Sequence, residues 1–300
     1  MVSRSGYRLP ALTHRSDGGW RRVGFELEFS GIGLEQTVSA ICQALKATPG
    51  EGTAAQQRIE VPDLGEFQVE LDWAFLKRVA AEQSTESGPD WVQPLSQAAE
   101  VLVPVEVVCP PISVAELDRL DPLVSALRAA GAQGTEESLL AAYGVHINPE
   151  LPALDAPVLS AYLRAFCLLQ WWLVEHHEVN LARKISPYID LYPEAYVEWV
   201  LDRKAPDMER IFADYLQHNA TRNRALDLLP LLAHIDEQRV RSVVDDPRIK
   251  SRPTFHYRLP NCHIERPDWA LSSSWNTWCQ CRLLKSPKSQ LEMSPPPRHQ

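Results

Sequence analysis

Five short segments of this chain alternate apolar and polar residues, and this pattern constrains the fold more than any other feature. The segments are 23–29, 67–73, 103–107, 145–148 and 255–259. Successive residues of a β-strand point to opposite faces, so each segment is predicted to form a strand with one apolar and one polar face. The pattern is typical of antiparallel strands that cover a core on one side only.

Three other stretches have apolar residues at helical spacing, and each is predicted to form a helix. They are 34–45, 114–127 and 158–179. Strands with interspersed helices, without strict β-α-β alternation, indicate an α+β fold. We therefore expect a twisted antiparallel β-sheet with helices packed on one face.

The 300 residues are 45% hydrophobic, which is enough to bury a sizeable core. Residues 1–20 lack periodicity, and we expect them to be a flexible arm. Residues 286–300 are rich in Pro, Ser, Lys and Arg and are expected to be a disordered tail. Residues 21–285 remain as one folded domain.

The formal net charge of −9 argues against nucleic acid or an anionic membrane as a partner. The most apolar long segment, 161–174, is interrupted by Arg164 and Gln170 and is too short to span a bilayer. The six cysteines form no Cys-x-x-Cys pair, which favours buried free thiols in a reducing compartment. We expect a soluble, cytoplasmic protein.

The polar face of the predicted strands carries acids, imidazoles and one arginine instead of the neutral residues of a solvated sheet. These residues are Glu26, Glu28, Asp72, Glu106, His146, Asn148, His256 and Arg258. Carboxylates that share one face repel each other unless a cation neutralises them, and their oxygens suit Mg²⁺ or Mn²⁺. An arginine beside them suits a transferring phosphoryl group. Each residue alone fits a solvated strand or a surface ion pair, but the shared face favours a chemical site.

A second candidate lies in segment 218–227, where Arg222 and Arg224 precede the apolar run 228–235. Asn219 or Thr221 could cap a helix N-terminus there. Arginines and a helix N-terminus both favour anions, so the segment could also contact phosphate. Both interpretations stay open at this point.

Four motifs, in this order, resemble the amidoligase family of carboxylate–amine ligases. They are Gly24-Phe-Glu26-Leu-Glu28-Phe, then Asp72, then Val105-Glu106-Val-Val-Cys-Pro-Pro111, then Gly144-Val-His146-Ile-Asn148-Pro. The resemblance runs from about Gly24 to Arg282. It implies that 21–285 is an amidoligase catalytic domain with a glutamine synthetase-like fold.

The resemblance also implies roles for individual residues. In that superfamily the Glu-x-Glu strand supplies ligands to the metals that hold ATP, which gives this role to Glu26 and Glu28. Glu106 resembles a further metal ligand, and His146 resembles a residue that contacts metal and nucleotide. Asn148 belongs to the same strand and is expected at the nucleotide.

The segment from Phe255 to Asn261 is similar to the strand that carries the family's phosphate-contacting arginine, which implies that role for Arg258. His256 stands where relatives carry a metal-ligating glutamate; as a metal ligand here, its imidazole would suit Mg²⁺ less well than a carboxylate does. Arg222 and Arg224 resemble an Asn-Arg element of glutamine synthetases and are expected to contact the nucleotide.

The implied reaction is ATP-dependent amide formation through an acyl phosphate, with ATP and Mg²⁺ (or Mn²⁺) as cofactors. The expected substrates are a small-molecule or peptide carboxylate and an amine. The sequence leaves open whether the protein forms an oligomer. Asp72 is expected to orient or deprotonate the amine, although a structural role beside the metal is an alternative. A metal-dependent hydrolase and a noncatalytic binding module on the same fold are the competing functions.

Overall fold

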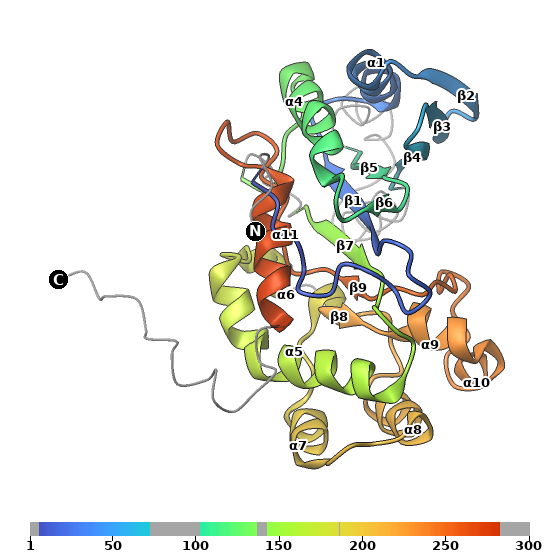
Figure 1. The fold of residues 1–300 in the computed structure, drawn as a ribbon. Helices are drawn as coiled ribbons and strands as arrows, with labels where there is room; N and C mark the ends of the chain where they lie inside the picture. Colours follow the sequence, from blue (N-terminus) through green and yellow to red (C-terminus); the bar gives the residue numbers. More distant parts are fainter. Residues whose placement is uncertain (1–5, 73–102, 137–142, 186, 283–300) are drawn as a thin grey trace.

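The computed structural model describes residues 6–72, 103–136, 143–185 and 187–282. Within them, nine strands form one antiparallel sheet in the order β2-β3-β4-β5-β1-β7-β9-β8, with β6 paired to β1 (Figure 1). The strands are β1 (Arg22–Phe29), β2 (Thr48–Gly52), β3 (Gln56–Val61), β4 (Gly65–Leu71), β5 (Val105–Val108), β6 (Ile112–Ser113), β7 (Val145–Pro149), β8 (Leu226–Asp227) and β9 (His256–Tyr257). The predicted α+β fold with an antiparallel sheet is confirmed. Its glutamine synthetase-like character stays a prediction.

Each of the five alternating segments contributes a strand, namely β1, β4, β5, β7 and β9. The predicted strand at 67–73 ends at Leu71, and Trp73 lies outside the described residues. Strands β2 and β3 were not predicted. All of β2 is exposed, and a strand with no buried face leaves no alternation in the sequence.

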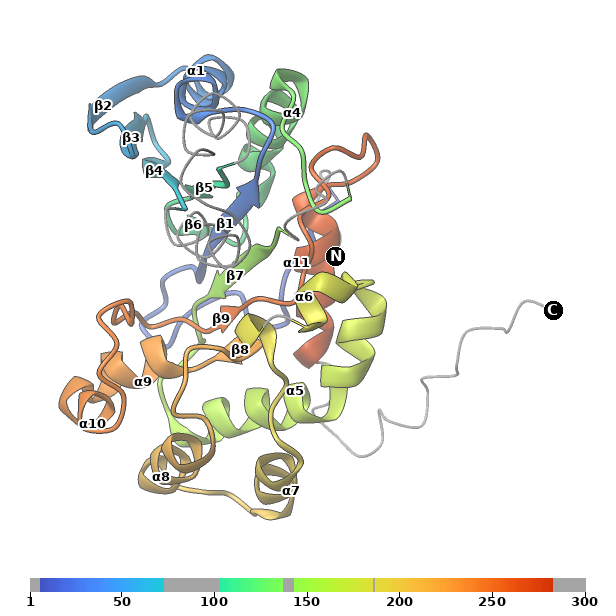
Figure 2. The ribbon, with the colours of Figure 1, turned by 180° about the vertical axis from the view of Figure 1, so that it is seen from behind.

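The helices are gathered around two halves of the sheet. They are α1 (Leu34–Leu45), α4 (Asp121–Ala130), α5 (Ala156–His176), α6 (Leu181–Ile185), α7 (Glu194–Asp202), α8 (Met208–His218), α9 (Leu229–Ile235), α10 (Glu237–Arg241) and α11 (Leu271–Trp278). Figures 1 and 2 show α1 and α4 beside β1–β6, whereas α5 and α7–α10 lie at the other half with β8 and β9. All three predicted helical stretches are confirmed, with the second one beginning as a 3₁₀ turn at Leu117–Leu120.

The apolar face of the sheet is covered by these helices. Phe25 of β1 meets Trp275 of α11 with ring centroids 6.4 Å apart. Tyr257 of β9 meets Phe166 of α5 at 6.3 Å and Trp278 of α11 at 4.9 Å. Large aromatic side chains bury much apolar area, so these contacts fix the helices on this face. The polar face of the same strands is left on the opposite side.

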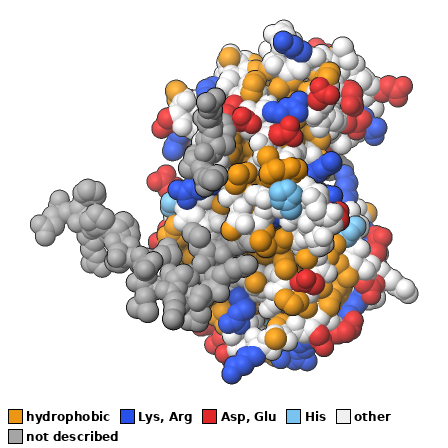
Figure 3. All heavy atoms as spheres, in the orientation of Figure 1, with side chains coloured by type: hydrophobic (Ala, Val, Ile, Leu, Met, Phe, Trp, Pro, Cys, Tyr) orange, Lys and Arg blue, Asp and Glu red, His pale blue; other side chains and the backbone are white. Residues whose placement is uncertain are grey.

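Helix α5 is long and apolar enough, by length and composition, to cross a bilayer. Its Leu159, Phe166, Cys167 and Leu173 are buried in the hydrophobic core instead. Charged side chains of both signs are spread over the surface drawn in Figure 3. Helix α5 is therefore the core helix of a soluble domain.

Five of the six cysteines are free thiols, as predicted: Cys42, Cys109, Cys167, Cys262 and Cys279. Burial raises the pKa of the Cys167 thiol to about 12. A cytoplasmic location stays a prediction.

Over residues 6–20 the structure differs from the flexible arm expected there. Tyr7 is buried in the core, and its hydroxyl donates to Asp121 Oδ1 at 3.1 Å. The backbone of Arg8 bonds α11 twice, donating to Asn276 Oδ1 at 2.7 Å and accepting from Trp275 Nε1 at 2.8 Å. No periodic pattern marks this segment in the sequence, because a few isolated contacts, such as those of Tyr7 and of the Arg8 backbone, anchor it. The expected tail at 286–300 lies outside the described residues, and the domain boundaries stay predictions.

Trp275 is fully buried between the sheet and the N-terminal segment. Trp275→Ala is expected to lower the free energy of unfolding by roughly 3–5 kcal/mol, because it opens a cavity and removes the bond to Arg8. Urea denaturation followed by circular dichroism measures the change. The control is Trp171→Ala on α5, whose side chain is 54% exposed, and its effect is expected within about 0.5 kcal/mol. Equal losses in the two variants would contradict the packing described.

Candidate functional site

Three carboxylates lie side by side across the middle of the polar face. Glu28 of β1 pairs with Glu106 of β5, and Glu106 pairs in turn with Glu70 of β4. Asp72 follows directly after β4, and its backbone N–H donates to Pro104 O at 2.9 Å. Register, rather than sequence proximity, therefore gathers the acids at one place.

Imidazoles and an arginine follow on the next strands of the same face. Glu26 pairs with His146 of β7. The pair Ile147 and Tyr257 between β7 and β9 lies on the apolar face, so the neighbouring His146, His256 and Arg258 lie on the polar face. The predicted strand-borne site residues thus share one face, acidic toward β4 and basic toward β9.

Glu26 is surrounded by hydrogen-bond donors. Its Oε2 lies 2.9 Å from His146 Nδ1, and its Oε1 accepts from Asn148 Nδ2 at 2.8 Å. Arg252 Nη2 lies 3.5 Å from Oε1, and His256 Nε2 lies 3.6 Å from Oε2. Burial opposes ionisation, but His256, His146 and Arg252 outweigh it and hold the pKa of Glu26 well below its usual range. Glu26 is therefore a buried carboxylate with several donors around it.

Glu28 occupies a more open position beside the same histidine. Its Oε2 accepts from the backbone N–H of Gly144 at 2.8 Å, and its Oε1 lies 3.6 Å from His146 Nε2. A Cβ atom on Gly144 would lie 2.6 Å from Arg183 Nη2 and 3.3 Å from Glu28 Oε2. Glycine is required at this position because two functional groups approach its backbone closely.

Glu106 lies among the other carboxylates of the acidic end, and its ionisation is opposed there. Burial raises its pKa well above the usual range, and the charges of Glu26, Glu28, Glu70 and Asp72 raise it further. Four acidic groups thus oppose the ionisation of Glu106, and a divalent cation at this end would offset their repulsion.

The basic end is organised around Asp227 of β8. Asp227 is fully buried and lies 3.4 Å from Arg258 Nη2. Burial raises the pKa of Asp227, while Arg258 lowers it. Burial also lowers the pKa of His256 well below its usual range, and the nearby Arg258 acts in the same direction. His256 is therefore a neutral imidazole at neutral pH.

The structure separates Arg222 from Arg224. Burial lowers the pKa of Arg222, and the charge of Arg258 lowers it further, so the charges of these two guanidinium groups interact. Arg224 donates to the carbonyl oxygens of Leu191 and His218 at 3.1 and 3.2 Å. Arg222 thus interacts electrostatically with the basic end of the face. Arg224 instead binds backbone carbonyl oxygens. The nucleotide role of both arginines stays a prediction.

The interpretation of segment 218–227 as a helix N-terminus is wrong. Residues 219–225 form a loop between α8 and β8, and α9 begins at Leu229. The oxygen that serves the first turn of α9 belongs to Asp227, whose Oδ1 accepts from Leu229 N at 2.9 Å. Asn219 and Thr221 resemble caps in sequence but are followed by a strand.

Three residues of the site, Glu70, Asp227 and Arg252, were missed as candidates. Glu70 and Asp227 fit the polar side of their strands, and strand alternation gave a signal for Glu70. Arg252 lies in the loop before β9, where no periodicity marks it. Arg183 of α6 donates to the carbonyl oxygens of Arg258, Leu259 and Pro260 at 2.6–2.8 Å. Figure 2 shows α6 near the ends of β7 and β9.

Two groups of side chains on the face could hold a metal ion: Glu28 with Glu106 and His146, and Glu26 with His146 and His256. The first group fits a divalent cation well, because it is oxygen-rich and because burial and neighbouring carboxylates oppose the ionisation of Glu106. Two ligands that each lie about 2.1 Å from one ion are about 3 Å apart, which is close to the separation of Glu28 Oε1 and His146 Nε2. A third group, Glu136, His263 and Glu265, lies outside the face.

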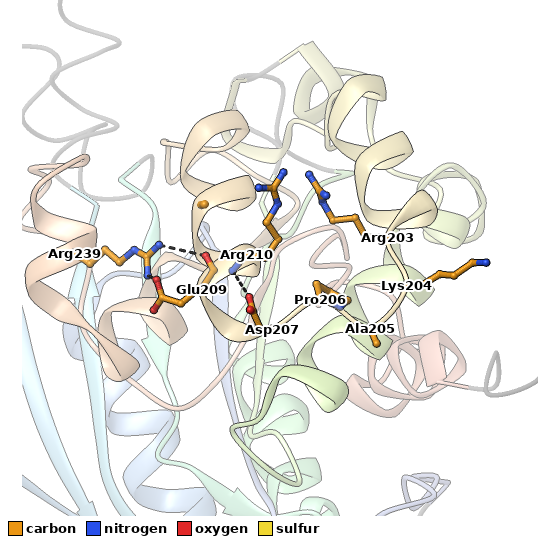
Figure 4. Close-up of a pocket in the computed structure, with 9 residues that line it drawn as sticks. Arg203, Lys204, Ala205, Pro206, Asp207, Glu209, Arg210 and Arg239 are labelled. Carbon is orange, nitrogen blue, oxygen red and sulfur yellow. Dashed lines mark hydrogen bonds and ion pairs between the residues drawn. The ribbon is translucent and has the colours of Figure 1, made fainter.

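A surface cavity of about 630 Å³ lies between the end of α7 and the start of α8 (Figure 4). Its arginines are already paired, Arg239 with Glu209 at 2.8 Å and Arg210 with Asp214 at 3.1 Å. None of the polar-face residues lines this cavity. We therefore assign the chemistry to the sheet face and not to the cavity.

Comparison with protein families gives a match to the family described as putative amidoligase enzyme over residues 20–280. The match covers most of the chain and includes every strand of the polar face. The chain belongs to this family. No match was found among curated proteins or solved structures. In this amidoligase-family chain the predicted family is thus confirmed, and the family motifs meet on one face of one sheet.

The raised pKa of Glu106 gives a test of the acidic end. In the unfolded chain Glu106 loses its proton at an ordinary pKa, whereas the folded protein resists that loss. The metal-free wild type is therefore expected to lose stability, compared with Glu106→Gln, as the pH rises above the ordinary pKa of a glutamate. Thermal unfolding with EDTA measures the difference. The control Glu66→Gln, on an exposed site of β4, is expected to follow the wild type at every pH. A Glu106→Gln curve parallel to the wild type would contradict the assignment.

Proposed function

We propose that this protein is an ATP-dependent carboxylate–amine ligase that forms an amide or peptide-like bond through an acyl phosphate. One observation carries the proposal: a cluster of carboxylates lies on the same sheet face as the guanidinium group of Arg258, whose charge also acts on Arg222. The cluster is Glu28, Glu106 and Asp72. A Mg²⁺ or Mn²⁺ nucleotide has the matching charges, a cation for the acids and phosphates for the arginines. The family description supports a ligase.

The proposed metal ligands are Glu28, Glu106 and the Nε2 atom of His146. A divalent ion there would neutralise phosphate oxygens and orient the nucleotide. Asn148 is proposed to face the nucleotide, because its buried Oδ1 has no hydrogen-bond partner among the described residues. The fold is proposed to be glutamine synthetase-like, and the compartment a reducing cytoplasm.

In the first step, an oxygen of the substrate carboxylate attacks the γ-phosphorus of ATP. The new O–P bond forms as the bond to the bridging oxygen breaks, and ADP leaves. Arg258 is proposed to bind the transferring phosphoryl group, with Arg222 as a second guanidinium group, because fixed guanidinium groups stabilise charge that spreads over phosphoryl oxygens. Buried Asp227 holds Arg258 in position at 3.4 Å.

In the second step, the amine nitrogen attacks the acyl carbon, the carbon–oxygen bond to phosphate breaks, and the amine gives up a proton. Asp72 is proposed to orient the amine and to accept that proton. It lies at the end of β4, close enough to Glu106 to raise the pKa of that group. A small-molecule or peptide carboxylate and an amine are the proposed substrates.

The test supplies ATP and Mg²⁺ or Mn²⁺ with pooled carboxylic acids and amines, and measures ADP, phosphate and amide. We expect ADP and phosphate in equal amounts with the amide. Arg258→Ala is expected to lower kcat by roughly 100- to 1000-fold, since it removes a charge that acts in the transition state. The control Arg266→Ala breaks a surface pair with Glu136 and is expected to keep full activity.

Several results would contradict the ligase. Production of AMP and pyrophosphate would exclude an acyl phosphate. Activity that is unchanged in Glu28→Gln, or an absence of nucleotide binding, would remove the proposed site. Hydrolysis that requires metal but no ATP would favour the metal-dependent hydrolase.

A further inference from the structure

Arg252 approaches the Glu26 side of the face from the loop between α10 and β9. Its Nη2 lies 2.8 Å from His256 Nδ1 and 3.5 Å from Glu26 Oε1. His256 is buried, and its Nε2 points toward Glu26 Oε2 at 3.6 Å. Glu26, His256 and Arg252 thus form a compact cluster in which a permanent cation stands beside the carboxylate.

Hydrogen-bond chemistry fixes the proton on His256. A guanidinium group can only donate, so the Nδ1 of His256 must accept from Arg252. A neutral imidazole that accepts at Nδ1 carries its proton on Nε2. The nitrogen that faces Glu26 therefore presents an N–H to the carboxylate and has no lone pair for a metal ion.

The same reasoning gives His146 the opposite tautomer. Ionised Glu26 can only accept, so His146 Nδ1 must donate to it at 2.9 Å. The lone pair of His146 then lies on Nε2, which is 3.6 Å from Glu28 Oε1. A carboxylate behind a histidine is a common support for a metal ligand, because it fixes the ring orientation and tautomer.

We infer that Arg252 neutralises Glu26 in the place of a second metal ion, while the Nε2–H of His256 faces the same carboxylate, so that this face binds one divalent ion between Glu28, Glu106 and His146 Nε2. The inference deepens the proposed function and rests on the divalent ion of that site. It departs from the metal-ligand roles expected for Glu26 and His256. Glu26 becomes the positioning residue of His146, and Arg252 a built-in cation.

The experiment is a Mn²⁺ titration without nucleotide, with free Mn²⁺ measured by electron paramagnetic resonance. The wild type is expected to bind one Mn²⁺ per chain, and Glu28→Gln to bind none. Arg252→Ala removes the cation beside Glu26 and the donor that fixes the proton of His256 on Nε2. This variant is expected to bind two Mn²⁺ ions per chain. If His256 is too weak a ligand, the double variant R252A with H256E supplies a carboxylate and is expected to bind two.

The matched control is Arg248→Ala in the same loop, where the arginine is exposed and pairs with Asp246 at 2.7 Å. It is expected to bind one Mn²⁺, like the wild type. Circular dichroism and thermal unfolding check that every variant is folded. Two ions, or none, in the folded wild type would overturn the inference. So would loss of the ion in Glu26→Gln together with its retention in Glu28→Gln.

The tautomers give a second readout that does not depend on metal affinity. In protein labelled with ¹⁵N-histidine, we expect the proton of His256 on Nε2 and that of His146 on Nδ1, with signals assigned from His256→Gln and His146→Gln. A proton on Nδ1 of His256 would overturn the inference. Binding of one Mn²⁺ without any ADP formation would contradict only the ligase, whereas ADP formation with two ions would contradict only the charge assignment.

Discussion

The mutual repulsion of carboxylates is the constraint on which this structure depends. Three neighbouring strands place Glu70, Glu106 and Glu28 in one row, and burial together with the neighbouring carboxylates holds the pKa of Glu106 well above its usual range. A fold that carries such a row without a cation gives up stability. The opposite face compensates, because Phe25, Tyr257 and the tryptophans of α11 close a continuous apolar core. Packing on one face thus supports charge concentration on the other.

Much of the fold could be predicted because strand alternation is a local property. The period of two in 23–29 and 145–148 needs no knowledge of partners, and it assigned Glu26, Glu28, His146 and Asn148 to one face correctly. Where a strand has no buried side, as in Thr48–Gly52, the sequence contains no such signal. The pairing order of the strands was not predicted, because it depends on contacts between distant segments.

The parts of the site that escaped prediction are those that tertiary structure brings in. Arg252 lies in an irregular loop, and only the path of that loop brings it to Glu26. Asp227 was hidden at the start of an apolar run, and the segment before it resembles a helix start. The two arginines of that segment could not be distinguished in sequence, whereas in the fold one interacts with the charge of Arg258 and the other binds carbonyl oxygens. Local patterns define faces, but they do not define which loops reach those faces.

The bonds that Arg183 makes tie the backbone around Arg258 to helix α6. The segment around Arg258 has backbone bonds to its neighbours, from Arg258 N to Ala225 O and from Val145 N to Pro260 O, each at 2.9 Å. Arg183 adds bonds to three consecutive carbonyl oxygens of the same segment. The backbone that carries the proposed phosphate contact is therefore aligned by a side chain 75 positions earlier in the chain. Burial lowers the pKa of Arg183 to about 10, which shows how much solvation this clamp gives up. A small shift of α6 would displace the backbone around Arg258 while leaving each residue of the polar face chemically intact.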